Sequence, residues 1–275
     1  MLLGVHCSVA GGLENAFTQA AEFNINTFQI FTRNQRQWKA KPITADEQKK
    51  FKAALRASNV KTAFSHCSYL INLAAGDNDM LIKSITALIE EVERCTALGL
   101  SYCVLHPGAA GGQTMDDAIF RIAEALKIVL LKTPSSKVMI LLEITAGQGS
   151  SVGGKFENLK EIYNHVKSKR IGYCFDTCHA FASGYDIRTE KGMAVTMKEF
   201  DDILGIKNLK VFHLNDSKGD LDSHLDRHEN IGKGKLGLAP FRYIMQNFPD
   251  IPKVLETPKE DDGDKINLAV LRKMV

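Results

Sequence analysis

Residues 138–176 read VMILLEITAGQGSSVGGKFENLKEIYNHVKSKRIGYCFD and contain the unit from which the fold is built. The stretch begins with a short apolar run, Val138 to Glu143, and ends with a second one, Ile171 to Asp176. Runs of this length and composition are typical of buried strands. A helical pattern follows Phe156 between them. Strand, helix and strand in this order predict two parallel strands joined by a crossover helix.

The same unit recurs along the whole chain. Further strand candidates are Leu2 to His6, Thr27 to Phe31, Lys61 to His66, Ser101 to His106, Leu209 to Leu214 and Pro252 to Glu256. Apolar residues at helical spacing run from Leu13 to Ala21, Leu81 to Val92 and Ile119 to Leu130, and weaker patterns follow Thr44, Met197, Pro240 and Lys265. Thr44 with Glu47 predicts a capping box, and Leu98-Gly99 predicts a helix end. Eight alternating units predict an α/β fold, a closed (β/α)8 TIM barrel, with an open doubly wound sheet as the alternative.

Composition limits the class of protein. The chain has 275 residues, 44% hydrophobic and 24% charged, which excludes disordered and collagen-like proteins. No apolar run approaches the roughly 18 residues of a membrane span, and the N-terminus lacks a basic leader, so a cytoplasmic protein is expected. Six cysteines without a C-x-x-C pair are read as free thiols. No Gly/Pro/Ser-rich linker interrupts residues 1–275, so we expect a single domain.

Potential metal ligands stand where strand candidates end. The last residues of five of them are His66, His106, Glu143, Asp176 and Glu256, and His213 lies one residue before the end of a sixth. Any one of these alone would be explained by ordinary hydrogen bonding. In a parallel barrel, however, all strand ends open onto one face. A carboxylate that ends a buried apolar run is also costly unless it is paired or metal-bound. The six side chains are therefore expected to converge on metal.

Two short motifs extend this set. His179 follows Asp176 by three residues, and Asp226 and His228 have the i, i+2 spacing that points two side chains to one side of an extended segment. Five imidazoles and four carboxylates exceed one tetrahedral site and suit two or three ions with a bridging carboxylate. The mixture of nitrogen and oxygen favours zinc, with manganese or iron as alternatives. Clustered ions of this kind hydrolyse phosphate esters.

Several of these motifs resemble one known family, the endonuclease IV family of apurinic/apyrimidinic (AP) endonucleases. The resemblance runs from the Ser8 to Gly12 loop to Glu256 and is carried by the segments 106–108, 143–149, 175–186, 213–218 and 226–229. It implies a zinc-dependent TIM barrel that cuts duplex DNA on the 5′ side of an abasic site and leaves a 3′-hydroxyl and a 5′-deoxyribose phosphate. Two residues depart from the family pattern: Ile144, within the segment 143–149, and Asp222, between the segments 213–218 and 226–229.

The resemblance also implies roles for individual residues. It implies three zinc ions: one on His66, His106 and Glu143, a second on Glu143, Asp176, His213 and Glu256, and a third on His179, Asp226 and His228. Glu143 and Glu256 would be the catalytic residues that orient the attacking hydroxide. Arg36, Tyr69 and Leu70 would enter the helix at the lesion, and Gln37 would contact DNA beside them.

When the resemblance is set aside, the residues of the loops allow both a structural and a DNA-binding interpretation. The segment Thr32 to Lys39, which holds the only tryptophan, fits a solvated loop or one that contacts a DNA groove. The segment Ser68 to Asn72 fits core packing or an apolar wedge in a kinked duplex. The Gly-rich stretches Gly147 to Gly154 and Gly232 to Lys235 fit phosphate-binding loops or ordinary barrel loops.

Some residues beside the motifs are expected to play no part in the site. His6, His165 and His224 lack a partner at metal spacing and are interpreted as structural or surface residues. Cys67 and Cys178 adjoin ligands, but neighbouring side chains in a segment point in different directions.

The sequence thus favours a monomeric enzyme that acts on double-stranded DNA containing abasic sites, with no membrane partner. A divalent-metal sugar isomerase or epimerase on the same scaffold and a catalytically silent DNA-damage binder are the alternatives. The third ligand group and the loops around Arg36 and Tyr69 count against the first, because a small sugar needs neither. The net charge of +3 does not by itself indicate DNA binding.

Overall fold

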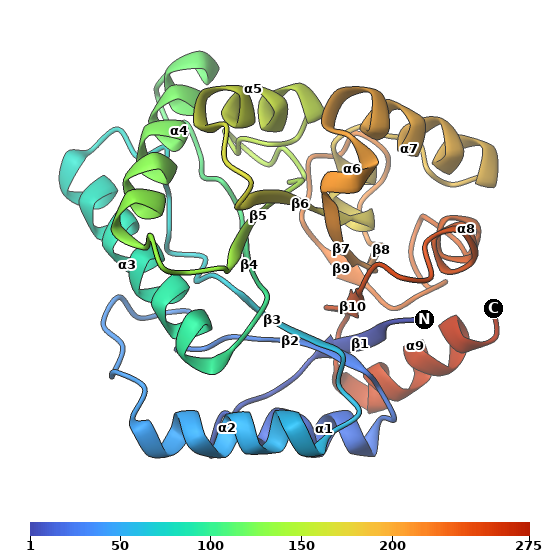
Figure 1. Ribbon diagram of the computed structural model, residues 1–275. Coiled ribbons are helices and arrows are strands. Elements are labelled where there is room, and N and C mark those ends of the chain that lie inside the picture. Colours follow the sequence, from blue (N-terminus) through green and yellow to red (C-terminus); the bar gives the residue numbers. More distant parts are fainter.

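Parallel strands close into a barrel in the computed structural model, which describes residues 1–275 (Figure 1). Around the barrel the strands follow chain order, and the last pairs with the first. They are β1 (Leu3–His6), β2 (Thr27–Ile30), β3 (Thr62–His66), β4 (Tyr102–Leu105), β5 (Met139–Glu143), β6 (Ile171–Asp176), β7 (Leu209–His213) and β10 (Lys253–Leu255). The predicted TIM barrel is confirmed, and the open sheet is excluded.

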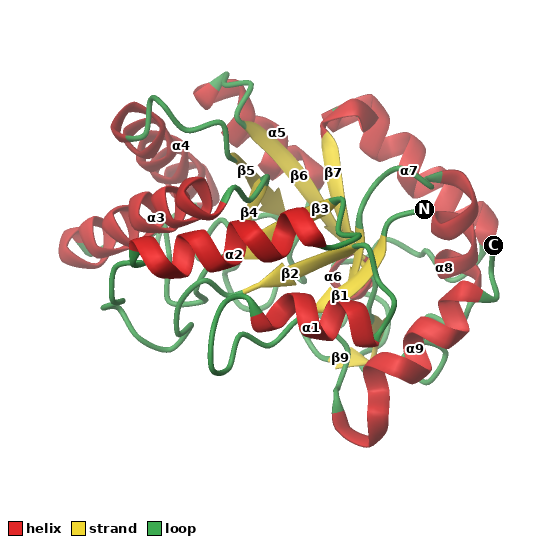
Figure 2. Cartoon of the chain, turned by 60° about the horizontal axis from the view of Figure 1, so that its bottom comes forward, coloured by secondary structure: helices red, strands yellow, loops and turns green.

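Helices surround the barrel and cover its outer face (Figure 2). They are α1 (Asn15–Glu22), α2 (Ala45–Ala57), α3 (Asn78–Leu98), α4 (Met115–Lys132), α5 (Phe156–Val166), α7 (Glu190–Leu204), α8 (Ala239–Asn247) and α9 (Gly263–Arg272). The predicted helix signals are present: Thr44 forms the capping box with Glu47 at α2, and α3 ends before Gly99, which has a φ of 78°. None of the helices has the length and apolar character needed to cross a bilayer.

Short elements beyond the strand ends escaped the sequence patterns. Helix α6 (Thr177–Ala182) starts directly after β6 and is buried on every side, so it has no apolar stripe. A small hairpin joins β8 (Asp216–Ser217) to β9 (His228–Glu229), and single 3-10 turns lie at η1 (Ile206–Asn208) and η2 (Glu260–Asp262). Helix α7 begins earlier than the pattern after Met197 indicated, because Thr189 caps its first turn.

The barrel interior explains why the strand ends carry polar residues. Six buried side chains, one per strand, form an apolar layer inside the barrel: Phe64, Val104, Leu141, Cys174, Val211 and Val254. Side chains that are two residues apart on a strand point to the same face. Two positions after each member stand the six expected strand-end ligands, in the same order: His66, His106, Glu143, Asp176, His213 and Glu256. These side chains therefore form the next layer, at the mouth of the barrel, with an apolar layer beneath them.

Candidate metal centre

Glu143 lies at the middle of the layer formed by the strand-end side chains. Its side chain is fully buried, and its two oxygens face different imidazoles. Oε2 is 3.1 Å from His66 Nε2 and 3.2 Å from His106 Nε2. Oε1 is 2.7 Å from His213 Nδ1. One carboxylate thus joins two groups of potential ligands, as expected of a bridging residue.

The second group is centred on His213. Besides the contact with Glu143, His213 Nδ1 lies 3.3 Å from Glu256 Oε2 and 3.9 Å from Asp176 Oδ2. Three carboxylates therefore surround one ring nitrogen. Cys174 of the apolar layer also reaches this group, since its sulfur could share an ion with Glu143 and His213.

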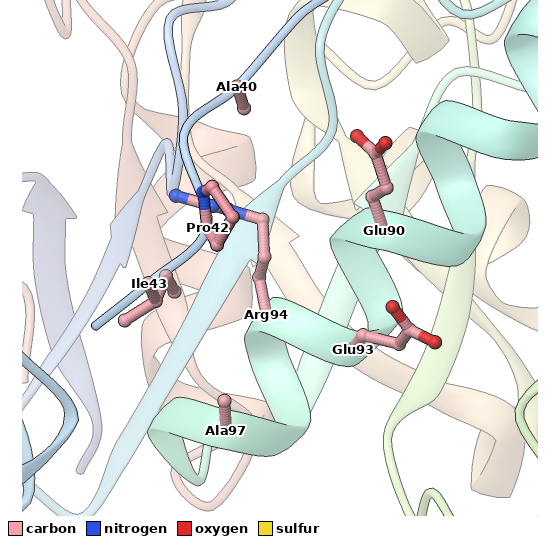
Figure 3. A pocket seen from close by; sticks show the side chains of 7 residues that line it. All are labelled: Ala40, Pro42, Ile43, Glu90, Glu93, Arg94 and Ala97. Atoms are coloured by element: carbon pink, nitrogen blue, oxygen red, sulfur yellow. The ribbon is translucent and has the colours of Figure 1, made fainter. Parts of the chain in front are cut away.

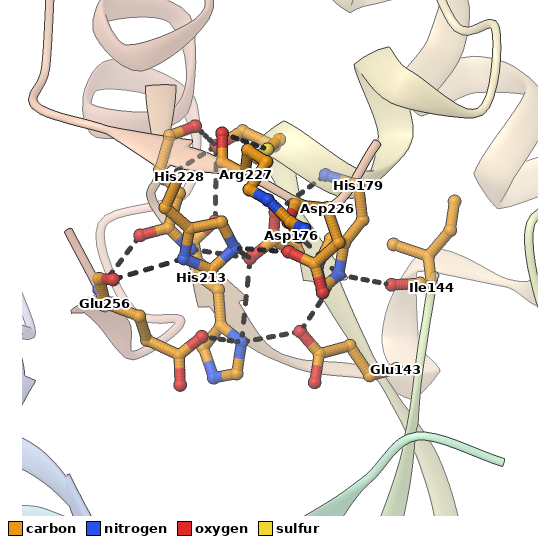
Figure 4. A network of polar contacts seen from close by, with 12 residues as sticks. Glu143, Ile144, Asp176, His179, His213, Asp226, Arg227, His228 and Glu256 are labelled. Atoms are coloured by element: carbon orange, nitrogen blue, oxygen red, sulfur yellow. Dashed lines mark hydrogen bonds and ion pairs between the residues drawn. The ribbon is translucent and has the colours of Figure 1, made fainter. Parts of the chain in front are cut away.

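The third group lies towards the rim, with Asp226 on the loop before β9, His228 at the start of β9 and His179 on helix α6. Asp226 Oδ1 is 3.2 Å from His179 Nε2 and 3.4 Å from His228 Nε2. His179 is placed here because α6 turns sharply after β6, with the Asp176 carboxylate accepting a hydrogen bond from the backbone N–H of His179. The structure thus brings together all nine residues that the sequence singled out, and Figure 4 shows the second and third groups.

The hydrogen bonds of the imidazoles test whether these groups suit a metal. His66 Nδ1 donates to the carbonyl of Cys67 at 2.7 Å, and His179 Nδ1 donates to that of Ile144 at 2.9 Å. His228 Nδ1 donates to the carbonyl of Glu256 at 3.1 Å. Since a neutral imidazole carries one proton, the other nitrogen of each ring bears a lone pair that points towards a carboxylate.

A lone pair facing a carboxylate is repulsive unless a cation lies between them. The buried Nε2 atoms of His179 and His228 have no hydrogen-bond partner at all. Metal-binding histidines commonly donate their second ring N–H to a carbonyl or carboxylate, which sets the tautomer and frees the other nitrogen for the ion. The donor set and its hydrogen bonds therefore fit transition-metal ions such as zinc.

The protonation equilibria of the protein without metal show the same demand for positive charge. Burial alone lowers the pKa of His179, yet the facing carboxylates of Asp176 and Asp226 outweigh it and raise that pKa well above its usual value. Burial alone raises the pKa of Glu143, yet His213 and His106 outweigh it and hold that pKa well below the usual range. In the absence of metal, protons bound to the imidazoles supply the positive charge that the carboxylates require.

The loops expected to read DNA lie at the same mouth. Arg36 and Gln37 are exposed, Tyr69 is 56% exposed, and Leu70 is half-buried. The ring centre of Tyr69 is 5.0 Å from that of His66 and 5.5 Å from that of His106. Tyr69 therefore stands beside the first ligand group rather than in the core.

Side-chain to backbone hydrogen bonds hold the loop of Arg36 in place. Ser68 donates to the carbonyl of Gln35 at 2.7 Å, which ties this loop to that of Tyr69. Arg33 donates to the carbonyl of Trp38, and Arg94 of α3 donates to Lys41 O at 2.8 Å. Figure 3 shows Arg94 in a cavity of about 250 Å³ between α3 and the segment 40–43. No histidine lines this cavity.

Of the two interpretations of the second Gly-rich stretch, Gly232 to Lys235, the backbone hydrogen bonds support an ordinary barrel loop. The carboxylate of Asp216 accepts hydrogen bonds from the backbone N–H groups of Gly232 at 2.8 Å, Gly234 at 3.1 Å and Leu236 at 3.0 Å. These N–H groups already donate to a carboxylate of the protein, so they are not available to a phosphate.

Three residues at the site were missed by the sequence patterns. Asn215 donates to Asp176 Oδ2 at 2.6 Å and accepts from the backbone N–H of Glu256 at 2.9 Å. His6, which was expected to lack a cluster partner, lies 3.7 Å from Glu256 Oε1. Gln29 bridges His6, Glu256 and His213. A polar residue inside the apolar run Thr27 to Phe31 was the available signal for Gln29.

The remaining expectations concern residues at the edge of the site. Cys67 Sγ contacts Cys103 Sγ at 3.0 Å and points away from the ligand groups, as expected. The expectation for Cys178 is wrong, because its Sγ, 3.7 Å from Arg227 O, also lies within 4.8 Å of ligand atoms of Asp176 and His228. His224 Nδ1 bonds to the carbonyl of Ala146 at 3.1 Å, as a structural histidine does. Asp222 has a φ of 59°, in the left-handed region that favours glycine.

Comparison with known proteins gives a consistent result. The family model described as a xylose isomerase-like TIM barrel matches residues 17–274. The probable endonuclease 4 of Trichlorobacter lovleyi is 44% identical over 277 residues, covering 99% of each chain. That of Citrifermentans bemidjiense is 45% identical over 279 residues, covering 100% of this chain and 99% of its own.

Solved structures show where the likeness is specific. The crystal structure of endonuclease IV from Thermus thermophilus matches with a TM-score of 0.90 at 32% identity, covering 100% of this chain and 98% of that one. A D-tagatose 3-epimerase-like protein also matches, with a TM-score of 0.78, over 100% of this chain and 97% of its own. At 18% identity the latter shares the fold alone.

Proposed function

This chain belongs to the endonuclease IV family, and on that basis we propose that it hydrolyses the phosphodiester bond on the 5′ side of an abasic site in duplex DNA. The products would be a 3′-hydroxyl and a 5′-deoxyribose phosphate. One observation carries the proposal: three groups of ligand side chains adjoin one another at the barrel mouth, and Glu143 is shared between two of them. A trinuclear centre of this kind suits phosphate-ester hydrolysis.

The residues present can hold three zinc ions, with manganese or iron as alternatives at some sites. His66, His106 and Glu143 would hold the first; Glu143, Asp176, His213 and Glu256 would hold the second. His179, Asp226 and His228 would hold the third. The chemistry supplied by bound zinc is the activation of water and the neutralisation of charge on the phosphate.

Glu256 is the carboxylate best placed to orient the attacking water. Burial alone raises its pKa, but His213, His6 and His66 outweigh it and hold that pKa well below the usual range. Glu256 is therefore ionised at neutral pH and can only accept hydrogen bonds, as a group that aligns a nucleophile should. Glu143 is ionised for a similar reason, and its oxygens hold the imidazoles of both adjoining groups in position.

The exposed loops would supply the recognition of damage. Tyr69 and Leu70 would fill the gap in a kinked duplex, and Arg36 and Gln37 would contact the strands beside it. An abasic nucleotide has lost its stacking and pairing, so turning it out of the helix costs less than for an intact nucleotide. The enzyme would then select by deformability rather than by sequence.

The decisive experiment is a nicking assay on an end-labelled duplex with one abasic site, using zinc-loaded protein. We expect one cut on the 5′ side of the lesion and a 3′ end that a DNA polymerase can extend. The intact duplex and a panel of aldoses and ketoses serve as controls. Sugar interconversion without nicking would establish the isomerase alternative, and lesion binding without nicking would establish a silent binder.

A further inference from the structure

Gln29 lies on strand β2, which contributes none of the expected ligands, and its side chain reaches the layer of ligands at the barrel mouth. It pairs in register with Phe64 of the apolar layer, and its side chain is fully buried inside the barrel. A buried amide needs partners for both ends, because an unsatisfied one is costly. The partners of Gln29 are all residues of the site.

Its hydrogen bonds fix the orientation of the amide. Nε2 lies 2.5 Å from Glu256 Oε1 and 2.9 Å from His6 Nδ1. Oε1 lies 2.8 Å from His213 Nε2. The reversed amide would set its oxygen against the Glu256 carboxylate, so the NH₂ group must face Glu256. The amide oxygen then faces His213 and can only accept, which places the His213 proton on Nε2.

This arrangement differs from that of three other ligand imidazoles. His66, His179 and His228 each donate to a backbone carbonyl, which no substitution of a side chain removes. His213 instead depends on a side chain from β2. With its proton held on Nε2, His213 directs the Nδ1 lone pair towards Glu143, Glu256 and Asp176.

We propose that Gln29 is a positioning residue that sets the tautomer of His213 and the orientation of Glu256 through one amide, and so preorganises the second metal site. The inference rests on the proposed function, since it assigns Gln29 to the ion that Glu143, Asp176, His213 and Glu256 would share. Outer partners of metal ligands of this kind change metal affinity by about 10- to 100-fold when they are removed.

The test compares two variants of the same strand face. Gln29→Met keeps the length of the side chain but removes its donor and its acceptor. Thr27→Val is the matched control, because Thr27 lies two residues earlier on β2, is equally buried, and bonds only to Thr62 O at 2.8 Å, away from the ligands. Zinc-loaded proteins are challenged with a chelator, and release of zinc is followed with a chromogenic indicator.

We expect Gln29→Met to release one equivalent of zinc about 10- to 100-fold faster than the wild type, while Thr27→Val releases it at the wild-type rate. The kcat of Gln29→Met on the abasic duplex should fall with little change in KM, because the substitution leaves the DNA-contacting loops untouched. Equal zinc release by Gln29→Met and Thr27→Val would overturn the inference while leaving the proposed function intact. A wild-type protein that holds no zinc would overturn both.

A second measurement needs no variant of Gln29. Long-range ¹H–¹⁵N spectra of the zinc-loaded protein labelled in histidine, assigned by single histidine substitutions, report which ring nitrogen carries a proton. We expect a slowly exchanging proton on His213 Nε2. A His213 that is protonated on Nδ1 and free on Nε2 would refute the proposed role even if Gln29→Met failed to fold.

Discussion

The imidazole of His228 donates from Nδ1 to the backbone carbonyl of Glu256, over 3.1 Å. A residue of the third ligand group is thus held by the main chain of a residue of the second. His179 repeats the relationship, since its Nδ1 bonds to the carbonyl of Ile144, the residue after Glu143. Because a backbone carbonyl accepts each bond, the unusual Ile144 side chain leaves the contact intact. The third group is therefore positioned by the strands that carry the other two.

Replacement of Glu143 by glutamine should nearly abolish cleavage while the fold remains intact. The glutamine retains the shape of the side chain but loses the charge that the surrounding imidazoles require, and we expect nicking to fall by more than about 100-fold. Steady-state nicking, circular dichroism and zinc content check this. Glu91→Gln is the matched control: Glu91 is also fully buried, but it lies on α3 and accepts hydrogen bonds from Thr32, away from the ligand groups. An active Glu143→Gln enzyme would remove Glu143 from the mechanism.

Metal removal should inactivate and destabilise the protein. We expect about three zinc ions per chain by elemental analysis, and a melting temperature at least about 5 °C lower after chelation, since ligands that bind only the folded state stabilise it. Zinc should restore both activity and stability. Magnesium should restore neither, because five of the nine donors are imidazoles. Fewer than two tightly bound transition ions per chain would contradict the trinuclear centre.

Tyr69→Ala should weaken the selection of abasic DNA rather than the chemistry. Stacking on an aromatic ring contributes about 1–3 kcal/mol per base, so we expect kcat/KM on the abasic duplex to fall by about 10- to 100-fold. Single-turnover nicking at saturating enzyme should change much less. Phe120→Ala provides the control, because Phe120 is 53% exposed but lies on α4, on the outside of the barrel. If both variants behaved alike, Tyr69 would have no part in recognition.

Asp216→Ala should unfold the segment 230–236 locally. Its carboxylate accepts hydrogen bonds from three backbone N–H groups of that segment, and hydrogen bonds to a charged acceptor contribute about 1.5–3 kcal/mol each. Hydrogen exchange of the amides of Gly232, Gly234 and Leu236 should accelerate strongly. Asp220→Ala removes an exposed carboxylate 3.6 Å from Lys235 and should alter stability by less than about 1 kcal/mol. Unchanged exchange in Asp216→Ala would show that the segment is held by other contacts.

Lys253 should make stability rise at alkaline pH. It is fully buried at the start of β10, donates to the carbonyls of Phe248 and Ile251, and burial lowers its pKa to about 8. Between pH 8 and the ordinary lysine value near 10.4, the unfolded state binds more protons than the folded state, so the free energy of unfolding increases with pH. The gain is about 3 kcal/mol at most, because each pKa unit corresponds to about 1.4 kcal/mol.

Urea denaturation of the wild type and of Lys253→Met from pH 7 to 9.5 measures this effect. As pH rises, the free energy of unfolding of the wild type should increase relative to that of Lys253→Met. Lys210→Met, on the neighbouring strand β7, should show no such trend. A pH-independent difference between wild type and Lys253→Met would mean that Lys253 retains an ordinary pKa.

The sequence predicted the barrel and the metal-ligand candidates because both depend on period and position. Each strand is a short apolar run, and a residue such as Glu143 at the end of one must lie at the mouth once the strands are parallel. Gln29 and His6 could not be assigned in this way, since their role depends on which side chain faces them across the barrel. The role of the Gly232 and Gly234 N–H groups stayed open for the same reason, because their acceptor, Asp216, comes from a different turn of the chain.

The apolar layer beneath Glu143 has a consequence for how DNA approaches. Phe64, Leu141, Val211 and their neighbours exclude water from the barrel below the site, so charge bound above them is screened by solvent from one side only. Low-dielectric walls focus the field of such charge outwards, through the mouth. The chain as a whole carries only +3. A passing duplex should therefore sense little attraction from most directions and a steep one over the mouth. The barrel would then orient its substrate before contact, and the association rate should fall steeply with ionic strength.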